Sequence, residues 1–424
     1  MRVLLVGSGG REHALAMMLA RSPLLEALIV APGNPGTARY GRNVAVAVDD
    51  VAGLVELALG EGVDLVIPGP EAPLVAGLAD ACAAAGLACA GPSRAAAALE
   101  GSKAFTKSVA DAAGIPTARY EHFTDAEAAS EFVRRRGAPI VVKADGLAAG
   151  KGVVVAESVE EALAAIDMMM RAGGLGASGA EVVIEECLTG REVSLFALCD
   201  GLDAVLVGAA QDHKRIGEGD TGPNTGGMGA LCPPAGFDRA AQEAAVDVFV
   251  RPALAEMVRR GTPFRGVLFV GLMLTEQGPK LIEYNVRFGD PEAQVLLPRL
   301  TSDLLAAFAA MSEGRLSEVE FSFADIASVG VVIAGRGYPG APAKGGVIEG
   351  IARAEAIDGV QVFQAATKQV GDVLVGDGGR VLTVCAQRPD LRAARDAAYT
   401  AVAEITWADG VFRRDIALKA LDAA

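Results

Sequence analysis

Short apolar runs alternate with amphipathic stretches along the first hundred residues, and this alternation is the strongest constraint on the fold of the chain. Strand-like runs lie at residues 3–6, 28–30, 44–48 and 65–67. Helix-like stretches lie at residues 11–21, 51–59 and 73–85. Strands that alternate with helices form βαβ units around a parallel sheet. The sequence therefore predicts an N-terminal α/β domain with a parallel sheet.

The pattern changes in the middle of the chain, where two β-branched runs flank a glycine-rich segment. Residues 140–143 and 153–156 predict two strands, and 144–152 predicts a loop across the tip of their hairpin. A helix and further strands are predicted at 160–171, 181–185, 192–198, 267–274 and 280–284. The last hundred residues predict strands at 328–333, 360–363 and 381–385, a hairpin turn at 377–379 and a closing helix at 391–405. We therefore expect several domains, with α+β organisation after the first.

Composition narrows the classes of partner and compartment. The net charge of −15 argues against a nucleic-acid partner, because phosphate backbones bind basic surfaces, but it leaves room for a small phosphorylated ligand. A hydrophobic content of 51% excludes intrinsic disorder, and the sequence has no apolar run long enough to predict a membrane span. Six scattered cysteines and a start without signal-peptide features predict a cytoplasmic protein.

A glycine-rich turn, Gly-Ser-Gly-Gly-Arg-Glu-His at residues 7–13, follows the first predicted strand and opens a helix. Free N–H groups at a helix start bind anions, so the turn predicts a phosphate site for a ligand of mononucleotide size. Glu12 stands where a dinucleotide-binding fingerprint has its third glycine, which argues against NAD. A tight turn without a ligand is the alternative.

The second glycine-rich loop, at residues 146–152, differs from a P-loop. Its glycine spacing is too short, and Gly152 follows Lys151 where a P-loop has serine or threonine. Its place between two strands predicts a flap whose N–H groups close on a triphosphate, with Lys143 and Lys151 neutralising phosphate oxygens. A flexible hairpin with solvated lysines is the alternative.

A dense polar run at residues 283–292 continues a predicted strand. Residues 283, 285 and 287 are expected on one face, because side chains alternate along a strand. The oxygens of Glu283 and Asn285 are ligands suited to Mg²⁺, and Arg287 is suited to clamp a carboxylate or phosphoryl group. An ordinary ion pair on a solvent face is the alternative.

The segment 211–229 is too long and too glycine-rich for a plain connection. Its backbone donors are suited to hold a substrate carboxylate or a developing oxyanion. A disordered surface loop is the alternative.

Together these motifs resemble the phosphoribosylamine–glycine ligases, or glycinamide ribonucleotide synthetases, of the ATP-grasp superfamily. The matching segments are 7–15, 31–34, 69–71, 101–105, 142–152, 211–229, 285–292 and 413–416. The resemblance implies ATP-dependent joining of glycine to 5-phosphoribosylamine in de novo purine synthesis, through glycyl phosphate and with Mg²⁺ or Mn²⁺. It also implies an N-terminal parallel-sheet domain like that of biotin carboxylase at 1–101 and an ATP-grasp domain at 102–325. A lid at about 120–187 and a small C-terminal α+β domain at 326–424 complete the implied fold.

The resemblance also implies roles for individual residues. Contacts to ATP are implied for Lys103, Lys143, Gly150, Lys151, Gly152, Glu185, Glu186, Leu188 and Glu192. The metal pair is Glu283 and Asn285. Substrate contacts are implied for Gly9, Gly10, Asn34, Glu71, Asp212, Arg215, Asn224, Gly226, Gly227, Met228, Arg287 and Asp290. Arg287, Asp212 and Lys214 are the implied catalytic residues.

Three positions depart from the family pattern. Cys187 at the adenine hinge and Ala90 replace usual aromatic residues, and Ala417 replaces a usual glycine. None of these changes removes a polar group that the chemistry needs. Two other functions are compatible with the motifs: an ATP-grasp ligase with a different acceptor, and a nucleotide-binding regulator without turnover. We expect a monomer that makes a transient contact with the preceding amidotransferase.

Overall fold

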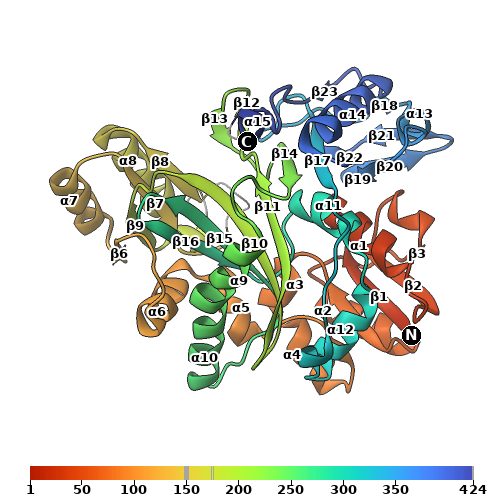
Figure 1. Ribbon diagram of the computed structural model, residues 1–424. Coiled ribbons are helices and arrows are strands. Elements are labelled where there is room, and N and C mark those ends of the chain that lie inside the picture. Colours follow the sequence, from red (N-terminus) through yellow and green to blue (C-terminus); the bar gives the residue numbers. More distant parts are fainter. Residues whose placement is uncertain (148–151, 173, 175, 423–424) are drawn as a thin grey trace.

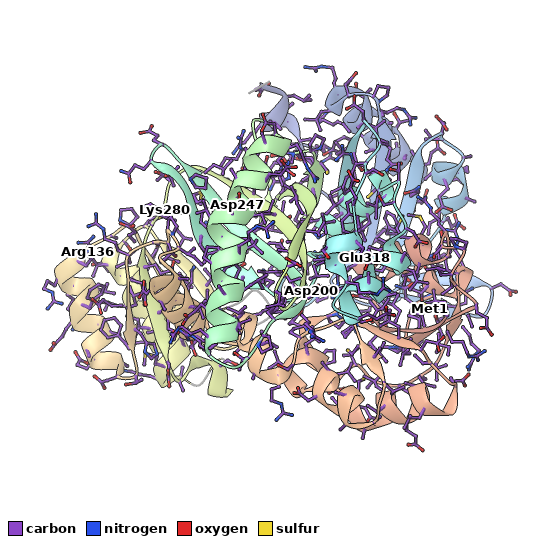
Figure 2. All side chains as sticks on the ribbon, turned by 60° about the horizontal axis from the view of Figure 1, so that its bottom comes forward. Met1, Arg136, Asp200, Asp247, Lys280 and Glu318 are labelled. Carbon is purple, nitrogen blue, oxygen red and sulfur yellow. The ribbon has the colours of Figure 1, made fainter. Side chains whose placement is uncertain are left out.

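The computed structural model describes residues 1–147, 152–172, 174 and 176–422 (Figure 1). The N-terminal domain, in red and orange, and the C-terminal domain, in blue, lie one below the other on the right of the view. The lid, which carries α7 (Ala126–Arg136), projects on the left. Figure 2 accordingly shows Met1 and Arg136 at opposite ends of the molecule.

The N-terminal sheet has five strands, all parallel, in the order β3-β2-β1-β4-β5. The strands are β1 (Arg2–Gly7), β2 (Ala27–Pro32), β3 (Arg42–Asn43), β4 (Leu65–Pro68) and β5 (Ala88–Cys89). The helices are α1 (Gly10–Leu19), α2 (Val51–Gly60), α3 (Glu71–Ala76), α4 (Leu78–Ala84) and α5 (Arg94–Gly101). The predicted parallel sheet is confirmed. Because the strand order reverses at β1, the carboxyl end of β1 faces a crevice, where ligands of such sheets bind.

Two local predictions in this domain were wrong. The valines of 44–48 do not form a strand: β3 ends at Asn43, and only the N–H of Val44 continues the pairing, to the carbonyl of Val30 at 2.9 Å. Val44, Val46 and Val48 instead pack on the sheet's core as an irregular extended segment. The helix predicted over 73–85 is two helices, because Gly77 has a φ of 95° that ends α3 and begins α4.

The lid is a four-stranded sheet with its own hydrophobic core. Its strands are β6 (Tyr120–Phe123), β7 (Ile140–Ala144), β8 (Val153–Ala156) and β9 (Val182–Glu186), in the order β6-β9-β7-β8. Helix α7, α8 (Val159–Ile166) and a π-helical turn at Asp167–Arg171 pack on it. The predicted β7–β8 hairpin is confirmed, with Ile140 opposite Ala156 and Lys143 opposite Val153.

A continuous sheet runs through the ATP-grasp region and into the C-terminal domain, in the order β16-β15-β10-β11-β14-β17-β22-β19. Its strands are β10 (Arg191–Asp200), β11 (Ala204–Asp212), β14 (Gly229–Cys232), β15 (Arg265–Thr275), β16 (Gly278–Asn285), β17 (Ala327–Gly335), β19 (Val360–Gln364) and β22 (Arg380–Arg388), with β23 (Gly410–Val411) on β17. The helices around it are α6 (Lys103–Ala113), α9 (Arg239–Ala245), α10 (Arg251–Arg259), α11 (Glu292–Leu296) and α12 (Leu304–Ser312). Strand β14 joins the two regions, since it pairs with β11 on one side and β17 on the other.

The C-terminal domain adds a second, three-stranded sheet, β18-β21-β20. Its strands are β18 (Val347–Ile348), β20 (Thr367–Val370) and β21 (Val373–Gly376), and the helices are α13 (Ile351–Glu355), α14 (Leu391–Glu404) and α15 (Leu418–Asp422). The hairpin turn predicted at 377–379 was wrong, because β21 pairs with β18 and β20 while β22 pairs with β17 and β19. That segment crosses from one sheet to the other. Within the described residues, no helix has the length and apolar character needed to cross a bilayer.

Candidate active site

The N-terminal turn is shaped by Glu12, in the first turn of α1. One of its carboxylate oxygens accepts a hydrogen bond from the N–H of Gly9 at 2.6 Å, and the other accepts one from Nε of Arg11 at 2.6 Å. Gly10 has no positive φ, yet a Cβ there would lie 2.5 Å from Nε2 of Gln294. Glycine at this position therefore lets α1 pack closely on α11, which the sequence alone did not indicate.

Arg287 lies beyond β16, which ends at Asn285, so only Glu283 and Asn285 occupy the predicted shared strand face. Its Nε lies 3.2 Å from a carboxylate oxygen of Glu71, and its Nη2 lies 2.8 Å from Oε1 of Glu100. Glu100 is buried on α5, and its other oxygen accepts the N–H of Val286 at 2.7 Å. Burial raises the pKa of Glu100 to about 7, although the Arg287 cation opposes this rise. Sequence reasoning missed Glu100, because a lone glutamate in an alanine-rich helix carries no motif.

Two buried lysines meet at Glu185, near the end of β9. Nζ of Lys143 lies 3.0 Å from one carboxylate oxygen and Nζ of Lys107 lies 3.1 Å from the other. Burial lowers the pKa of Lys107 to about 8, a shift that Lys143 reinforces and Glu185 opposes. The Glu185 carboxylate therefore holds Lys143 in place at the end of β7. Lys107, one helical turn after Lys103, was not among the predicted residues.

Lys103 is fixed beside the glycine-rich hairpin by the start of α6. Oγ of Ser102 caps this helix by accepting the N–H of Phe105 at 3.0 Å, and Asp145 accepts the N–H of Ala104 at 2.7 Å. Nζ of Lys103 donates to the carbonyl of Gly146 at 3.1 Å. The predicted residues Gly150 and Lys151 lie outside the described residues, whereas the carbonyl of Gly152 accepts the N–H of Ala144 at 2.8 Å.

The remaining predicted ATP residues lie along the hinge between lid and central sheet. Glu186 ends β9 and lies 3.4 Å from Nζ of Lys280, and the half-buried Leu188 follows that strand. Glu192, near the start of β10, forms an ion pair with Lys214. Lys214 therefore lies at the boundary between the hinge and the loop predicted to bind substrate.

Glu283 and Asn285 are two residues apart on β16, opposite Gly271 and Phe269 of β15. Burial by itself raises the pKa of Glu283, but the nearby ammonium groups of Lys214, Lys143 and Lys103 bring it below its usual range. Those lysines hydrogen-bond or pair with other groups, so the ionised carboxylate is available as a ligand. Within the described residues no cluster of three or more His, Cys, Asp or Glu side chains could hold a metal. Two oxygen donors fit Mg²⁺, which keeps waters and takes substrate phosphates as further ligands.

Asp212 ends β11, and its Oδ1 is buried without a hydrogen-bond partner among the described residues. Burial, reinforced by Glu292 and opposed by Lys214, raises its pKa well above the usual range. Gly227 lies against it with a φ of 112°, and a Cβ there would be 2.6 Å from Asp212 Oδ1 and 2.4 Å from Pro291 Cδ. The loop thus needs glycine to approach the buried carboxylate.

The other predicted substrate residues lie in the segment 211–229 or in the structure that packs around it. Asn34 is fully engaged: its Nδ2 donates to the carbonyls of Ser8 and Gln364, both at 2.8 Å, and its Oδ1 accepts the N–H of Gly36 at 2.7 Å. Its amide therefore shapes the wall of the site. Three more predicted residues lie in or near the hairpin of β12 (Arg215–Gly217) and β13 (Thr221–Asn224). Arg215 is opposite Asn224 in the register of this hairpin, and Met228 is buried in the C-terminal core.

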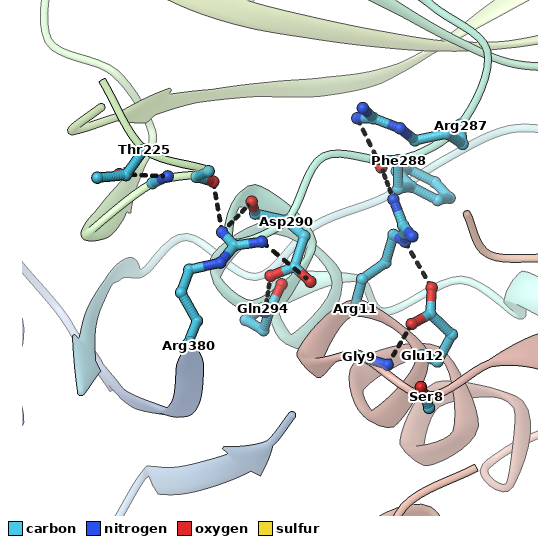
Figure 3. Close-up of polar contacts among 12 residues, drawn as sticks. Ser8, Gly9, Arg11, Glu12, Thr225, Arg287, Phe288, Asp290, Gln294 and Arg380 are labelled. Atoms are coloured by element: carbon cyan, nitrogen blue, oxygen red, sulfur yellow. Dashed lines mark hydrogen bonds and ion pairs between the residues drawn. The ribbon is translucent and has the colours of Figure 1, made fainter. Parts of the chain in front are cut away.

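Figure 3 shows Asp290 between Arg380 and Gln294, with Arg11 and Arg287 directed toward the carbonyl of Phe288. Gln294 donates to Oδ1 of Asp290 at 2.7 Å, and Nη2 of Arg380 lies 3.6 Å from its Oδ2. Cations from all three domains, Arg11, Arg287 and Arg380, therefore meet around the segment 288–290. This arrangement is suited to a phosphorylated substrate beside a nucleotide.

Known proteins are similar to this chain over its whole length. Residues 1–100, 101–293 and 328–419 match the N, ATP-grasp (A) and C domains of the family described as phosphoribosylglycinamide synthetase. The chain is 52% identical over 422 residues to the phosphoribosylamine–glycine ligase of Brucella melitensis biotype 1, which covers 100% of this chain and 99% of that protein. The chain belongs to the phosphoribosylamine–glycine ligase family. The chloroplastic member of this family from Arabidopsis thaliana is 48% identical over 97% of this chain and 79% of its own length.

Solved structures agree with this assignment. The phosphoribosylamine–glycine ligase of Thermotoga maritima superposes with a TM-score of 0.86 at 31% identity, over 98% of this chain and 100% of that chain. The biotin carboxylase domain of Hydrogenobacter thermophilus 2-oxoglutarate carboxylase, solved with MgADP, shares the fold at a TM-score of 0.72 and 17% identity, over 97% and 91% of the two chains. The expected family and the three-part fold are confirmed.

Ala417 is the departure from the phosphoribosylamine–glycine ligase pattern that the structure explains best. Its φ is 66°, in the left-handed region that favours glycine, and its N–H donates to Nε2 of His213 at 3.2 Å. The Ala417 methyl is fully buried in the C-terminal core, which offsets part of the backbone strain. At the hinge, burial raises the pKa of the Cys187 thiol, so this thiol serves as a small neutral group.

Proposed function

We propose that the chain uses ATP to join glycine to 5-phosphoribosylamine, forming glycinamide ribonucleotide, ADP and phosphate for de novo purine synthesis. The observation that carries this proposal is the convergence of three groups around one region. Lys143 and Lys103 supply cations beside the hinge, Glu283 and Asn285 supply oxygen ligands, and Arg287 connects them with the N-terminal domain.

The chemistry requires activation of the carboxylate of glycine, because an amine does not displace a carboxylate oxygen directly. Transfer of the γ-phosphoryl group of ATP to that carboxylate gives glycyl phosphate and ADP. The amine of phosphoribosylamine then attacks the acyl carbon, phosphate leaves, and the nitrogen loses a proton. Lys143, Lys103 and Arg287 stabilise the charge on the transferred group, and the site needs no nucleophilic side chain.

Mg²⁺ or Mn²⁺, bound by Glu283 and Asn285, would neutralise phosphate charge during this transfer. Lys214, paired with Glu192, keeps a cation close to Glu283 and favours its ionised, ligating form. An acyl phosphate hydrolyses in water, so the glycine-rich hairpin between β7 and β8 is expected to exclude solvent before transfer.

Asp212 is the group best suited to bind a substrate amine. Its buried Oδ1 lacks a partner among the described residues, and the backbone of Gly227 lies close to it. A bound ammonium or amine would satisfy this oxygen and favour the ionised carboxylate. We assign it to the recognition of glycine or of the ribosylamine nitrogen.

One assay tests the proposal against its two alternatives. ADP release that requires both glycine and phosphoribosylamine supports the proposed ligase. ADP release with a different carboxylate or amine would favour another ATP-grasp ligase, and nucleotide binding without turnover would favour a regulator.

Monomeric state, a cytoplasmic location and a transient contact with the preceding amidotransferase are further proposals, which light scattering, fractionation and cross-linking test in turn.

A further inference from the structure

Arg380 begins β22 in the C-terminal domain, and its side chain, 21% exposed, reaches two loops of the ATP-grasp domain. Its Nη1 donates to the carbonyls of Gly226 and Asp290, and its Nη2 lies 3.6 Å from the Asp290 carboxylate. Figure 3 shows this guanidinium between the loop that contains Thr225 and the segment that contains Asp290. One side chain therefore joins two segments predicted to form the substrate pocket.

The contact at Gly226 is close and is doubled by a second residue of the C-terminal domain. A Cβ on Gly226 would lie 3.0 Å from Cζ of Arg380, so the guanidinium lies directly against the backbone. The N–H of Gly226 donates to the hydroxyl of Tyr338 at 2.9 Å. Both backbone polar groups of Gly226 are thus bound by the C-terminal domain.

The loop that contains Gly226 also lies next to the buried carboxylate of Asp212. Gly227 follows directly, and a Cβ there would be 2.6 Å from Oδ1 of Asp212. The N–H of Gly227 donates to Oγ1 of Thr225 at 3.0 Å, which closes the turn. A shift of Gly226 would therefore move the wall beside Asp212 as well as Asp290.

We propose that Arg380 is a positioning residue for the phosphoribosylamine site, which it organises by fixing the Gly226 backbone against the Asp290 segment. This inference rests on the proposed function. The C-terminal domain then contributes to substrate recognition through Arg380, although the Arg380 guanidinium does not contact the reacting atoms. Arg380 begins β22 of the C-terminal domain, whereas Lys143 and Glu185 lie on β7 and β9 of the lid, so we expect ATP recognition to depend on it much less.

The test compares Arg380→Met with wild type by steady-state kinetics and by calorimetric binding of glycinamide ribonucleotide, a stable product. We expect the KM for phosphoribosylamine and the Kd for the product to rise about tenfold or more, because charged hydrogen bonds to the loop are lost, while the KM for ATP changes less than about twofold. Arg380→Lys should restore binding only in part, since one ammonium cannot reproduce the guanidinium fork. Arg353→Met is the matched control, because Arg353 is an arginine of the same domain that pairs with the Glu404 carboxylate at 3.1 Å and donates to the Glu404 carbonyl at 2.9 Å.

Unchanged product affinity in a folded Arg380→Met protein would overturn the inference, as would an equal loss of ATP affinity. If that variant does not fold, Tyr338→Phe decides: weaker product binding supports the role of the Gly226 clamp, and wild-type binding rejects it. A wild-type protein that does not release ADP with both substrates rejects the proposed function instead. The two failures are therefore distinguishable.

Discussion

The ammonium of Lys143 lies 3.0 Å from one carboxylate oxygen of Glu185, and the other oxygen lies 3.1 Å from Lys107. Lys143→Met removes the first contact and leaves the second, so the buried carboxylate keeps a partner. We expect kcat/KM for ATP to fall about 10- to 100-fold, since a charge-assisted contact to phosphate is lost, with the melting temperature nearly unchanged. Lys107→Met is the comparison, with a smaller effect on ATP. Wild-type ADP formation at low ATP by folded Lys143→Met would contradict this assignment.

Asn285 tests the metal pair. Asn285→Leu removes one oxygen ligand from the face that Glu283 shares, and we expect the Mg²⁺ concentration for half-maximal rate to rise about tenfold. Asn285→Asp keeps a hard oxygen and should retain much of the wild-type metal response. Identical Mg²⁺ titrations for Asn285→Leu and wild type would show that Glu283 and Asn285 have a structural role.

Gly10 tests the packing of the N-terminal turn. In Gly10→Ala the new Cβ would lie 2.5 Å from Nε2 of Gln294, which donates to Asp290 at 2.7 Å. We expect displacement of Gln294 to raise the KM for phosphoribosylamine about five- to tenfold, with the KM for ATP unchanged. Thermal melting is measured alongside, and adding Gln294→Ala should recover stability by removing the clash. Loss of ATP affinity with retained affinity for the amine would place the turn in the nucleotide site.

His13 makes stability depend on pH at the junction of the N- and C-terminal domains. Its Nδ1 accepts the N–H of Gln364 at 2.8 Å, and burial, reinforced by Arg39, lowers its pKa to about 3. The unfolded chain binds a proton at His13 more readily than the folded one. The stability that the neutral imidazole provides is therefore fully present above about pH 6.5. It is lost as the pH falls toward 3, at up to about 1.4 kcal/mol per pH unit. His13→Gln should flatten the pH dependence of the free energy of unfolding. Denaturant titrations at several pH values between 4.5 and 6.5 give the free energy of unfolding of both proteins. An equal dependence of that free energy on pH in wild type and His13→Gln would refute this account.

The N-terminal sheet was predictable from the sequence because each strand is a short apolar run bounded by helices. The errors arose where tertiary context decided the outcome. The valines at 44, 46 and 48 alternate like a strand, but β3 ends at Asn43 and these side chains pack on the core as an irregular segment. Likewise, Asp377-Gly378-Gly379 has the composition of a hairpin turn, whereas its flanking strands belong to different sheets.

For the candidate site, the sequence indicated which residues carry chemistry but not what holds them. The spacing of Glu283 and Asn285 predicted a shared face, which β16 provides. The partners of Glu185, Arg287 and Asp290 could not be read from spacing, because Lys107, Glu100 and Arg380 lie on elements that only folding brings near. Burial is likewise a property of the assembled domains, so the raised pKa of Glu100 has no counterpart in the sequence.

The pairing of β14 with both β11 and β17 has a consequence for how the protein comes apart. Backbone pairing through β14 crosses the boundary between the ATP-grasp and C-terminal domains, so we expect these two regions to unfold as a single cooperative unit. Removal of the last hundred residues would strip β17 from β14 and leave an open strand edge prone to pairing with other chains. The C-terminal domain therefore covers the edge of β14 that would otherwise be open. We expect a chain without this domain to aggregate and to lack ligase activity.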